Sequence, residues 1–274
     1  MKHLKIGFVG GGNMSRALIG GLISSGYPQN LITVTNPGLE KLQALKNDFG
    51  VAVSQDNAAA VKDAQVVILA VKPQVMAQVL EQLHQDPGIF DNKLIISLAA
   101  GVTTQRLANL MGGHGKIIRL MPNTPALIGQ GATGMYATSE VNDEEREFAQ
   151  DMLHAVGSAV WVRKEADINA VTAVSGSSPA YFFLFLEYLV NHGVEMGLSQ
   201  EQSRELALQT ALGAAKLALQ KSDISLQELR AQVTSKGGTT FAAITKFQEL
   251  DFKGMVDAAM DACRNRAEEM EKLF

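Results

Sequence analysis

The sequence predicts an α/β protein in two parts, a parallel-sheet domain over residues 1–162 and an all-helical domain over residues 163–274. Three observations predict this class. Short apolar segments alternate with helical patterns through the first half, which is typical of a parallel sheet covered on both faces. The segment from Val66 to Val71 is apolar throughout, as a central parallel strand should be. After about Val162 no convincing strand follows, only long amphipathic stretches rich in Ala, Leu and Met.

The elements of the first part follow one another as strand and helix in turn. Strands are expected at residues 5–9, 31–35, 66–70, 94–97, 116–120 and 159–162. Helices are expected at residues 15–25, 39–49, 57–62, 73–83, 103–111 and 142–156. The last helix begins at Asn142, an N-cap residue followed by acids that favour a helix N-terminus. In the second part, helices at residues 200–220 and 252–273 carry apolar faces that predict a homodimer formed through this domain.

Composition excludes several classes of partner. The 24 Lys and Arg against 28 Asp and Glu give a net charge of −4, which argues against nucleic acid or an anionic membrane as a partner. The stretch 180–190 is interrupted by Glu187 and is too short to span a bilayer. No targeting segment is found, and the single Cys263, expected to be inert packing, fits a reducing compartment. We therefore expect a cytoplasmic protein. The scattered histidines predict no metal site.

A glycine turn follows the first expected strand and opens a helix. Its pattern is Gly10-x-Gly12-x-x-Ser15, with serine at the third position. Glycines let backbone N–H groups approach a pyrophosphate, and the helix N-terminus adds partial positive charge. Because the motif is N-terminal and begins an alternating strand–helix series, it predicts a Rossmann-like dinucleotide site. The residues expected at the phosphates are Gly10, Gly11, Gly12, Asn13 and Met14.

The residues after the second strand indicate which dinucleotide binds. NAD enzymes place an acid there for the ribose 2′-OH, but this chain has Thr35-Asn36-Pro37-Gly38. A 2′-phosphate would meet hydroxyl and amide donors instead of a carboxylate. NADPH is therefore favoured as the cofactor, with NADH possible.

Further cofactor contacts are expected where other strands end, because ligands of open α/β sheets lie at those ends. These residues are Ala70, Val71, Lys72 and Pro73 after the central strand, Asn57 at the start of a helix, and Ala99 and Asn123 beside the expected nicotinamide. Each has an alternative interpretation: Lys72 as a solvated loop charge, Asn57 as a helix cap, and the loops of Ala99 and Asn123 as stiff connections.

Two segments stand out in the helical part. One runs from Ala173 to Tyr181 and contains Ser-Gly-Ser-Ser-Pro. The other, Thr234-Ser235-Lys236-Gly237-Gly238-Thr239-Thr240, breaks two helices with glycines and gathers hydroxyl residues around them. Backbone N–H groups and hydroxyls at a helix start form an anion nest suited to a small carboxylate. A plain helix–turn–helix joint would explain the glycines but not the hydroxyls.

Taken in order, these strings resemble pyrroline-5-carboxylate reductase, the last enzyme of proline biosynthesis. The resemblance covers essentially the whole chain, from the glycine turn through Val71-Lys72-Pro73 and the Met-Pro-Asn-Thr-Pro loop to the Gly-Gly-Thr-Thr joint. It implies a helical dimerisation domain, dimers that assemble into larger rings, and a cyclic imino acid as substrate. By position, Thr240 would hydrogen-bond the ring nitrogen as the catalytic residue. The carboxylate would be held by Ser235, Gly237, Gly238, Thr239 and Thr240.

Two positions depart from the pattern of that family. Lys236 stands where proline is usual, which would either loosen the carboxylate loop or add a cation near it. Ser178 stands where glycine is usual, at a close approach of helices near Gly176.

The chemistry fits these residues. A protonated imine is already electrophilic, so the protein mainly has to position it against the nicotinamide, and a hydroxyl such as that of Thr240 is a sufficient donor. Two alternatives belong to other classes. Enzymes resembling β-hydroxyacid dehydrogenases use a lysine on the first helix after the sheet, but no Lys or Arg lies between Gly176 and His192. A non-catalytic dinucleotide-sensing protein would not need the cluster of Ser235, Thr239 and Thr240.

Overall fold

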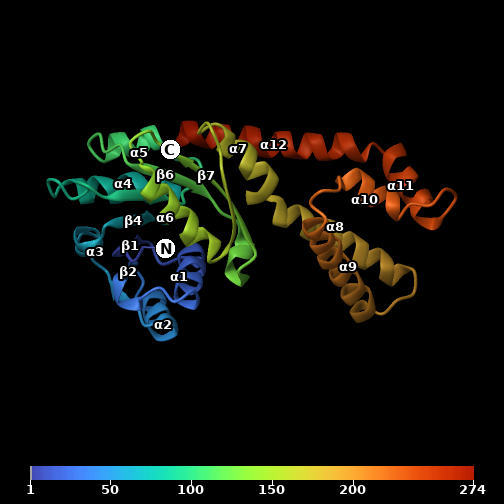
Figure 1. Cartoon of the computed structure of the whole chain (residues 1–274), viewed down its shortest axis with the longest axis horizontal. Coiled ribbons are helices and arrows are strands. Elements are labelled where there is room, and N and C mark those ends of the chain that lie inside the picture. Colours follow the sequence, from blue (N-terminus) through green and yellow to red (C-terminus); the bar gives the residue numbers. More distant parts are fainter. Residues whose placement is uncertain (1) are drawn as a thin grey trace. The chain divides into compact units, whose positions relative to one another are not determined.

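The computed structural model describes residues 2–274, and two compact units are seen within them (Figure 1). Unit 1 runs to Pro179 and resumes at Ala262, and unit 2 spans Ala180–Asp261. Two helices, α8 (Ser178–Glu195) and α12 (Phe252–Leu273), have residues in both units. The domain boundary between residues 162 and 163 stays a prediction.

Unit 1 is built on one sheet with the strand order β3-β2-β1-β4-β5-β6-β7-β8. The first six strands along the chain run parallel, and the register sets Ile6 of β1 opposite Ile32 of β2 and Val66 of β4. The sequence order reverses between β1 and β4, where an open sheet of this kind leaves a crevice for a ligand. The strands are β1 (Ile6–Val9), β2 (Ile32–Thr35), β3 (Ala52–Ser54), β4 (Val66–Leu69), β5 (Leu94–Ser97), β6 (Ile117–Met121), β7 (Gly131–Ala137) and β8 (Gly157–Trp161).

Helices cover both faces of this sheet, as expected from the alternating pattern (Figure 1). Successive strand residues enter two cores, so that Phe8 packs with α1, α2 and α6 while Val9 packs with α3, α4 and α5. The helices are α1 (Asn13–Ser24), α2 (Leu39–Phe49), α3 (Asn57–Asp63), α4 (Pro73–His84), α5 (Thr104–Leu110), α6 (Asp143–His154) and α7 (Asp167–Val171). Short turns lie at η1 (Gln29–Leu31), η2 (Thr124–Ile128) and the π-helical η3 (Thr172–Gly176).

Local sequence explains where several helices begin and end. Asn142 caps α6 and forms a capping box with Glu145, as its sequence signature predicts. Pro73 is the first residue of α4, where its missing N–H removes no helical hydrogen bond. Gly50 ends α2 at φ +68°, a conformation that favours glycine.

The sheet is parallel, as expected, except at one edge. β7 pairs antiparallel with β6, and β8 pairs parallel with β7, so both run against the other strands. The connection from β6 to β7 contains little besides the turn η2, and a parallel pair needs a crossover of a dozen or more residues. The strand predicted at residues 159–162 therefore exists as β8 but with reversed direction.

Unit 2 contains α9 (Gln200–Gln220), α10 (Leu226–Gln232), α11 (Thr239–Glu249) and parts of α8 and α12. The expected bounds of α9 and α12 agree with the structure. α8 and α9 meet where Ser203 donates to the carbonyl of Val190 at 2.8 Å. A Cβ added at Gly193 would lie 2.3 Å from the Ser203 hydroxyl, so the close approach requires glycine.

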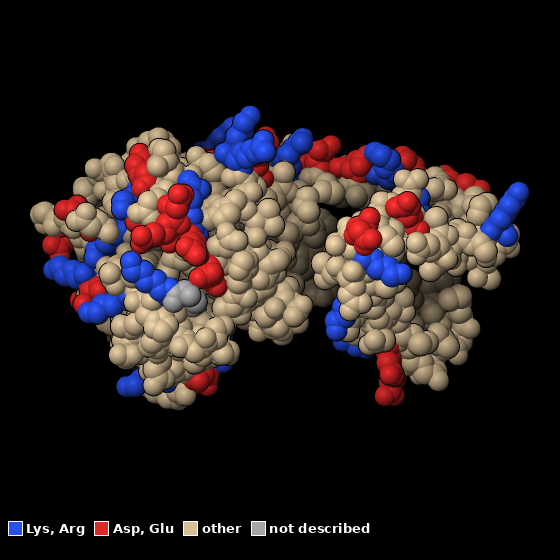
Figure 2. Space-filling view, in the orientation of Figure 1, with Lys and Arg blue, Asp and Glu red and all other residues tan. Residues whose placement is uncertain are grey.

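Much of the apolar surface of unit 2 is uncovered. Side chains of α8 such as Phe182 and Phe183 are about two-thirds exposed, at 65% and 66%. Leu206 and Leu212 on α9 are exposed as well. Figure 2 shows areas of this unit without charged side chains. Exposed apolar surface of this extent is typical of an interface with another subunit.

Candidate functional site

The glycine turn has the geometry of a phosphate cradle. Gly10 follows β1 at φ +110°, and a Cβ there would lie 2.7 Å from the carbonyl oxygen of Ala70, so only glycine fits. Gly12 is the N-cap of α1 and makes no side-chain cap. A Cβ at Gly12 would meet no atom within 4 Å, so the space in front of the helix is open. The N–H groups of Asn13 and Met14 begin α1 without intrahelical partners. These features fit a bound pyrophosphate.

Side chains hold this turn from both sides. The Ser15 hydroxyl is fully buried and donates to the Gly10 carbonyl at 2.5 Å, which accounts for serine at the third position of the motif. On the other side, the N–H of Gly11 donates to the carboxamide oxygen of Asn36 at 3.4 Å. Asn36 in turn donates to the carbonyl of Gly38 at 3.3 Å. The structure thus brings Asn36 to the cradle.

Thr35 and Asn57 form a hydrogen-bonded pair at the carboxyl end of β2. The Thr35 hydroxyl lies 2.5 Å from the carboxamide oxygen of Asn57 and 3.2 Å from the carbonyl of Phe8. Thr35 is fully buried, so its hydroxyl serves these internal partners and orients Asn57. Asn57 is the first residue of α3 and not its cap, because Asp56 caps this helix by accepting from the N–H groups of Ala58 and Ala59.

The other predicted cofactor residues lie at the carboxyl ends of β4, β5 and β6. Ala70 and Val71 are half-buried after β4, and the exposed Lys72 is the N-cap of α4. Ala99 is buried, and its N–H donates to the Ser97 hydroxyl at 3.3 Å. The side chain of Asn123 donates to the carbonyl of Ser175 at 3.0 Å and accepts from the N–H of Ala132 at 2.9 Å. Both ends of that carboxamide therefore serve structural contacts.

Unit 2 carries the predicted carboxylate loop. Gly237 adopts φ +77°, and the N–H of Gly238 donates to the Ser235 carbonyl at 3.0 Å, which closes a tight turn. Gly238 is the N-cap of α11 without a side-chain cap, so the N–H groups of Thr239 and Thr240 begin the helix without intrahelical partners. Ser235, Thr239 and Thr240 are all exposed. This arrangement can accept a small anion.

The segment before α8 contains a π-helical turn. The N–H of Ser177 donates to the carbonyl of Thr172 at 2.8 Å, five residues back. The Ser178 hydroxyl lies 2.9 Å from the carbonyl of Ala173 and 2.6 Å from that of Val174, so it satisfies carbonyls that this turn leaves open. A Cβ at Gly176 would lie 2.5 Å from the Met121 side chain, and the close approach is thus made at Gly176. Serine at position 178 does not disturb it.

A buried charge cluster was missed from the sequence. Arg119 on β6 is 2% exposed and donates to Glu165 at 2.9 Å and to Glu271 at 2.8 Å. A lone arginine inside the apolar segment Ile117–Leu120 was the available signal, because a buried charge needs a partner. Its partners lie 46 and 152 residues away in the chain and could not be read from spacing.

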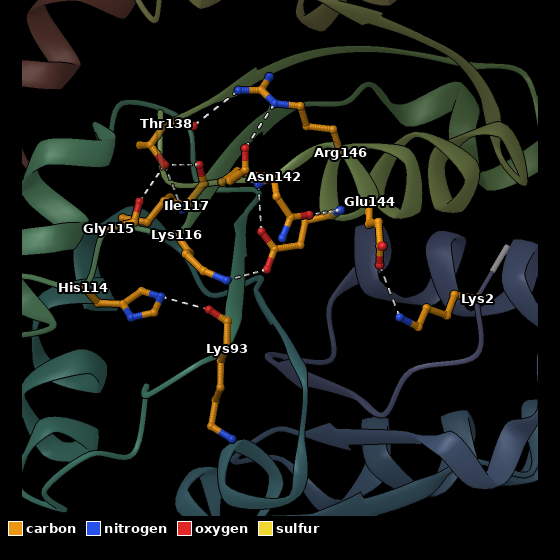
Figure 3. A network of polar contacts seen from close by, with 12 residues as sticks. Lys2, Lys93, His114, Gly115, Lys116, Ile117, Thr138, Asn142, Glu144 and Arg146 are labelled. Carbon is orange, nitrogen blue, oxygen red and sulfur yellow. Dashed lines mark hydrogen bonds and ion pairs between the residues drawn. The ribbon is translucent and has the colours of Figure 1, made fainter.

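A second polar network lies at the amino ends of β5 and β6 (Figure 3). Lys116, which precedes β6, pairs with Glu145 at 2.9 Å, and the His114 ring donates to the carbonyl of Lys93 at 3.0 Å. Burial lowers the pKa of His114, and hydrogen bonds to the backbone of Lys93 and Lys116 oppose that shift in part. Burial also lowers the pKa of the Lys93 ammonium. These groups lie at the amino ends of strands, whereas the glycine turn follows the carboxyl end of β1. We therefore assign them a structural role.

Two features are absent from residues 2–274. No group of three or more His, Cys, Asp or Glu side chains is arranged to hold a metal ion there. None of the helices described is long and apolar enough to cross a membrane. The thiol of Cys263 lies 3.3 Å from the Ser177 hydroxyl, next to the π-helical turn.

Two family models match the chain. Residues 5–101 match the model described as NADP oxidoreductase coenzyme F420-dependent, and residues 165–270 match the model described as pyrroline-5-carboxylate reductase dimerisation. Together with the sheet topology and the glycine cradle, the first match defines the class as a dinucleotide-binding oxidoreductase with a Rossmann-like domain. The fold class predicted from the sequence is thereby confirmed.

Relatives along the full length identify the family within this class. A pyrroline-5-carboxylate reductase of Haemophilus influenzae is 47% identical over 274 residues and covers 100% of both chains. That of Escherichia coli is 36% identical over 269 residues, or 98% of both. A solved pyrroline-5-carboxylate reductase from Coxiella burnetii superposes with a TM-score of 0.92 at 41% identity, covering 98% of this chain and 99% of that one. A Plasmodium falciparum structure with NADP bound gives 0.87 at 30% identity, covering 99% of both. The chain belongs to the pyrroline-5-carboxylate reductase family.

Proposed function

We propose that this protein reduces 1-pyrroline-5-carboxylate to L-proline with NADPH. One observation carries the proposal: a chain of this family combines the open glycine cradle at α1 with a hydroxyl-lined, open helix start at α11. The first suits a dinucleotide pyrophosphate and the second a small carboxylate. The substrate class is then a cyclic imine that bears an acid group.

The carboxylate would be held by main-chain and hydroxyl donors together. The N–H groups of Gly237, Thr239 and Thr240, with the Ser235 hydroxyl, present donors and the positive end of the helix dipole to an anion, while the N–H of Gly238 closes the turn on the Ser235 carbonyl. Lys236 adds an exposed ammonium to the same turn. No acid occurs between Leu229 and Gln248, so nothing in that stretch of chain opposes an anionic substrate.

The reaction asks little acid–base chemistry of the protein. A bound nicotinamide would supply the hydride for the imine carbon. The imine reacts in its protonated form, so the nitrogen already carries its proton, and the Thr240 hydroxyl hydrogen-bonds that ring N–H and so fixes the face that the imine presents. Positioning of this kind can supply on the order of 7–11 kcal/mol of the barrier. A non-catalytic dinucleotide-sensing protein would have no use for the Thr240 hydroxyl.

NADPH is preferred because the end of β2 carries no acid. With the Thr35 hydroxyl turned inward, the donors left for a 2′-phosphate are the Asn36 carboxamide and backbone N–H groups near Gly38. The absence of a carboxylate at this position removes a repulsion, and NADH remains a usable cofactor.

The assembly we propose is a homodimer formed through the helical domain at residues 163–274, with dimers associating into a ring. The exposed phenylalanines of α8 and the leucines of α9 supply the apolar surface for the first step. The protein works in the cytoplasm, and its substrates are small molecules only.

The test is an absorbance assay of reduced nicotinamide with the purified protein. We expect oxidation of NADPH in the presence of pyrroline-5-carboxylate, slower oxidation of NADH, and weak activity with cyclic imines that lack the carboxylate. Sedimentation of the same sample reports the oligomer. Absence of turnover with pyrroline-5-carboxylate and either nicotinamide would reject the proposal.

A further inference from the structure

The buried Arg119 connects two carboxylates from distant parts of the chain. Its guanidinium holds Glu165, from the loop before α7, and Glu271, near the end of α12. Both carboxylates are mostly buried, with side-chain exposures of 21% and 20%. Charges withdrawn from water to this degree hold a fixed geometry only if their remaining lone pairs are also satisfied.

Glu165 satisfies its lone pairs on Thr104. One carboxylate oxygen accepts the N–H of Thr104 at 2.7 Å, and the other accepts its hydroxyl at 2.6 Å. Thr104 is the first residue of α5 and is 6% exposed. The carboxylate therefore fixes where α5 begins, and with it the end of the loop at residues 98–103.

That loop is also held at its start and in its middle. Ser97 pairs with Arg119 in the register of β5 and β6, and its hydroxyl accepts the N–H of Ala99. Gly101 adopts φ +75°, and a Cβ there would lie 2.8 Å from Cβ of Met270. The loop is thus held at Ser97, Gly101 and Thr104, and the charge cluster acts directly on the last of these through Glu165.

We propose that Glu165 is a positioning residue that, through Thr104, fixes the loop at residues 98–103 against the nicotinamide ring. The proposal rests on the proposed function, since it needs the nicotinamide to lie at the carboxyl ends of β4, β5 and β6, beyond the pyrophosphate cradle. The backbone of residues 98–103 would pack against the flat nicotinamide ring. A shift of this loop by about 1 Å would move the ring away from the position that hydride transfer requires.

The principal test is Glu165→Gln, which keeps the size of the side chain. A carboxamide has one acceptor oxygen, so it cannot serve Arg119 and both donors of Thr104 together. We expect the single-turnover rate of NADPH oxidation to fall by about tenfold to a hundredfold, with a larger primary isotope effect from deuterated NADPH. The fluorescence of NADPH bound without substrate should change because its ring is less confined. Its Kd should rise by a smaller factor, since the phosphate contacts are intact.

The matched control is Glu145→Gln. It weakens the ion pair with Lys116 at the amino end of β6, where no ligand is expected (Figure 3). This variant should lose thermal stability yet keep the hydride-transfer rate, the isotope effect and the bound-NADPH fluorescence of the native protein. Equal kinetic losses in the two variants would assign a merely structural role to Glu165 and overturn the proposal.

A second pair of variants covers the case in which Glu165→Gln does not fold. Thr104→Val removes the hydroxyl that Glu165 accepts, and Thr104→Ser retains it. We expect the transfer rate to fall in the first and to recover in the second. A native rate and native bound-NADPH fluorescence in Thr104→Val would overturn the proposal. Failure of this proposal can be distinguished from failure of the proposed function. In the second case the unmodified protein itself would not oxidise NADPH with pyrroline-5-carboxylate.

Discussion

The hydroxyl of Ser15 donates to the carbonyl of Gly10 across 2.5 Å and links the glycine turn to the first turn of α1. Gly10 cannot carry a side chain, because its Cβ would collide with the Ala70 carbonyl. Gly12 stands in open space two residues later. The turn is therefore rigid where it meets β4 and empty where a ligand would enter.

Gly12→Val tests this division of roles. We expect NADPH binding to be lost, because the isopropyl group would occupy the path of the pyrophosphate. The fold should persist, since no protein atom lies within 4 Å of the new Cβ and the backbone at Gly12 is extended, with φ −83°. Fluorescence titration measures the affinity, and sedimentation measures whether the helical part still dimerises. Retained NADPH affinity would refute the assignment of this turn.

Thr240→Ala tests the residue assigned to the ring nitrogen. Loss of a hydroxyl that hydrogen-bonds the reacting group should lower kcat by about a hundredfold, with a smaller effect on the KM for NADPH. Thr234→Ala is the matched control in the same loop, because that hydroxyl is already committed to the carbonyl of Arg230 at 2.6 Å. Steady-state kinetics on both variants separates the two roles. An unchanged kcat in Thr240→Ala would remove Thr240 from the chemistry.

Lys236→Pro asks whether the cation in the carboxylate loop has a role of its own. Within residues 2–274 the Lys236 side chain has no hydrogen bond or ion pair, and it is exposed. We expect the variant to fold and to keep kcat/KM within about twofold, as surface substitutions usually do. Kinetics at two salt concentrations is the measurement. A collapse of activity in Lys236→Pro but not in Lys236→Arg would show that the lysine charge serves the substrate.

Local signals were enough to predict most helices and strands. The bounds of α2, α9 and α12 follow from apolar periodicity and agree with the structure. β7 was missed because its sequence, Gly-Ala-Thr-Gly-Met-Tyr-Ala, is rich in small residues with low strand propensity. The small residues are required there, since a Cβ at Gly134 would lie 2.4 Å from the Val171 side chain.

The parts of the candidate site that depend on backbone conformation could be predicted from the sequence. The parts that depend on contacts between distant side chains could not. The open cradle at Gly12 and the open helix start at Gly238 follow from glycine spacing. The inward turn of the Thr35 hydroxyl toward Asn57 depends on a contact across 22 residues, which no local pattern reports. The cluster at Arg119 depends on still longer separations for the same reason.

His114 predicts a loss of stability in mild acid. Its ring is half-buried against the carbonyl of Lys93, and this partial burial lowers its pKa in the folded protein below the ordinary value of 6.5 (Figure 3). Below about pH 6.5 the unfolded chain therefore binds a proton that the folded protein resists, so stability falls as the pH drops through this range.

His114→Gln retains a donor for the Lys93 carbonyl but does not titrate. Melting temperatures measured between about pH 7.5 and about pH 5.5 should thus fall more for the native protein than for His114→Gln. Parallel curves for the native protein and His114→Gln would contradict the assignment of this acid sensitivity to His114.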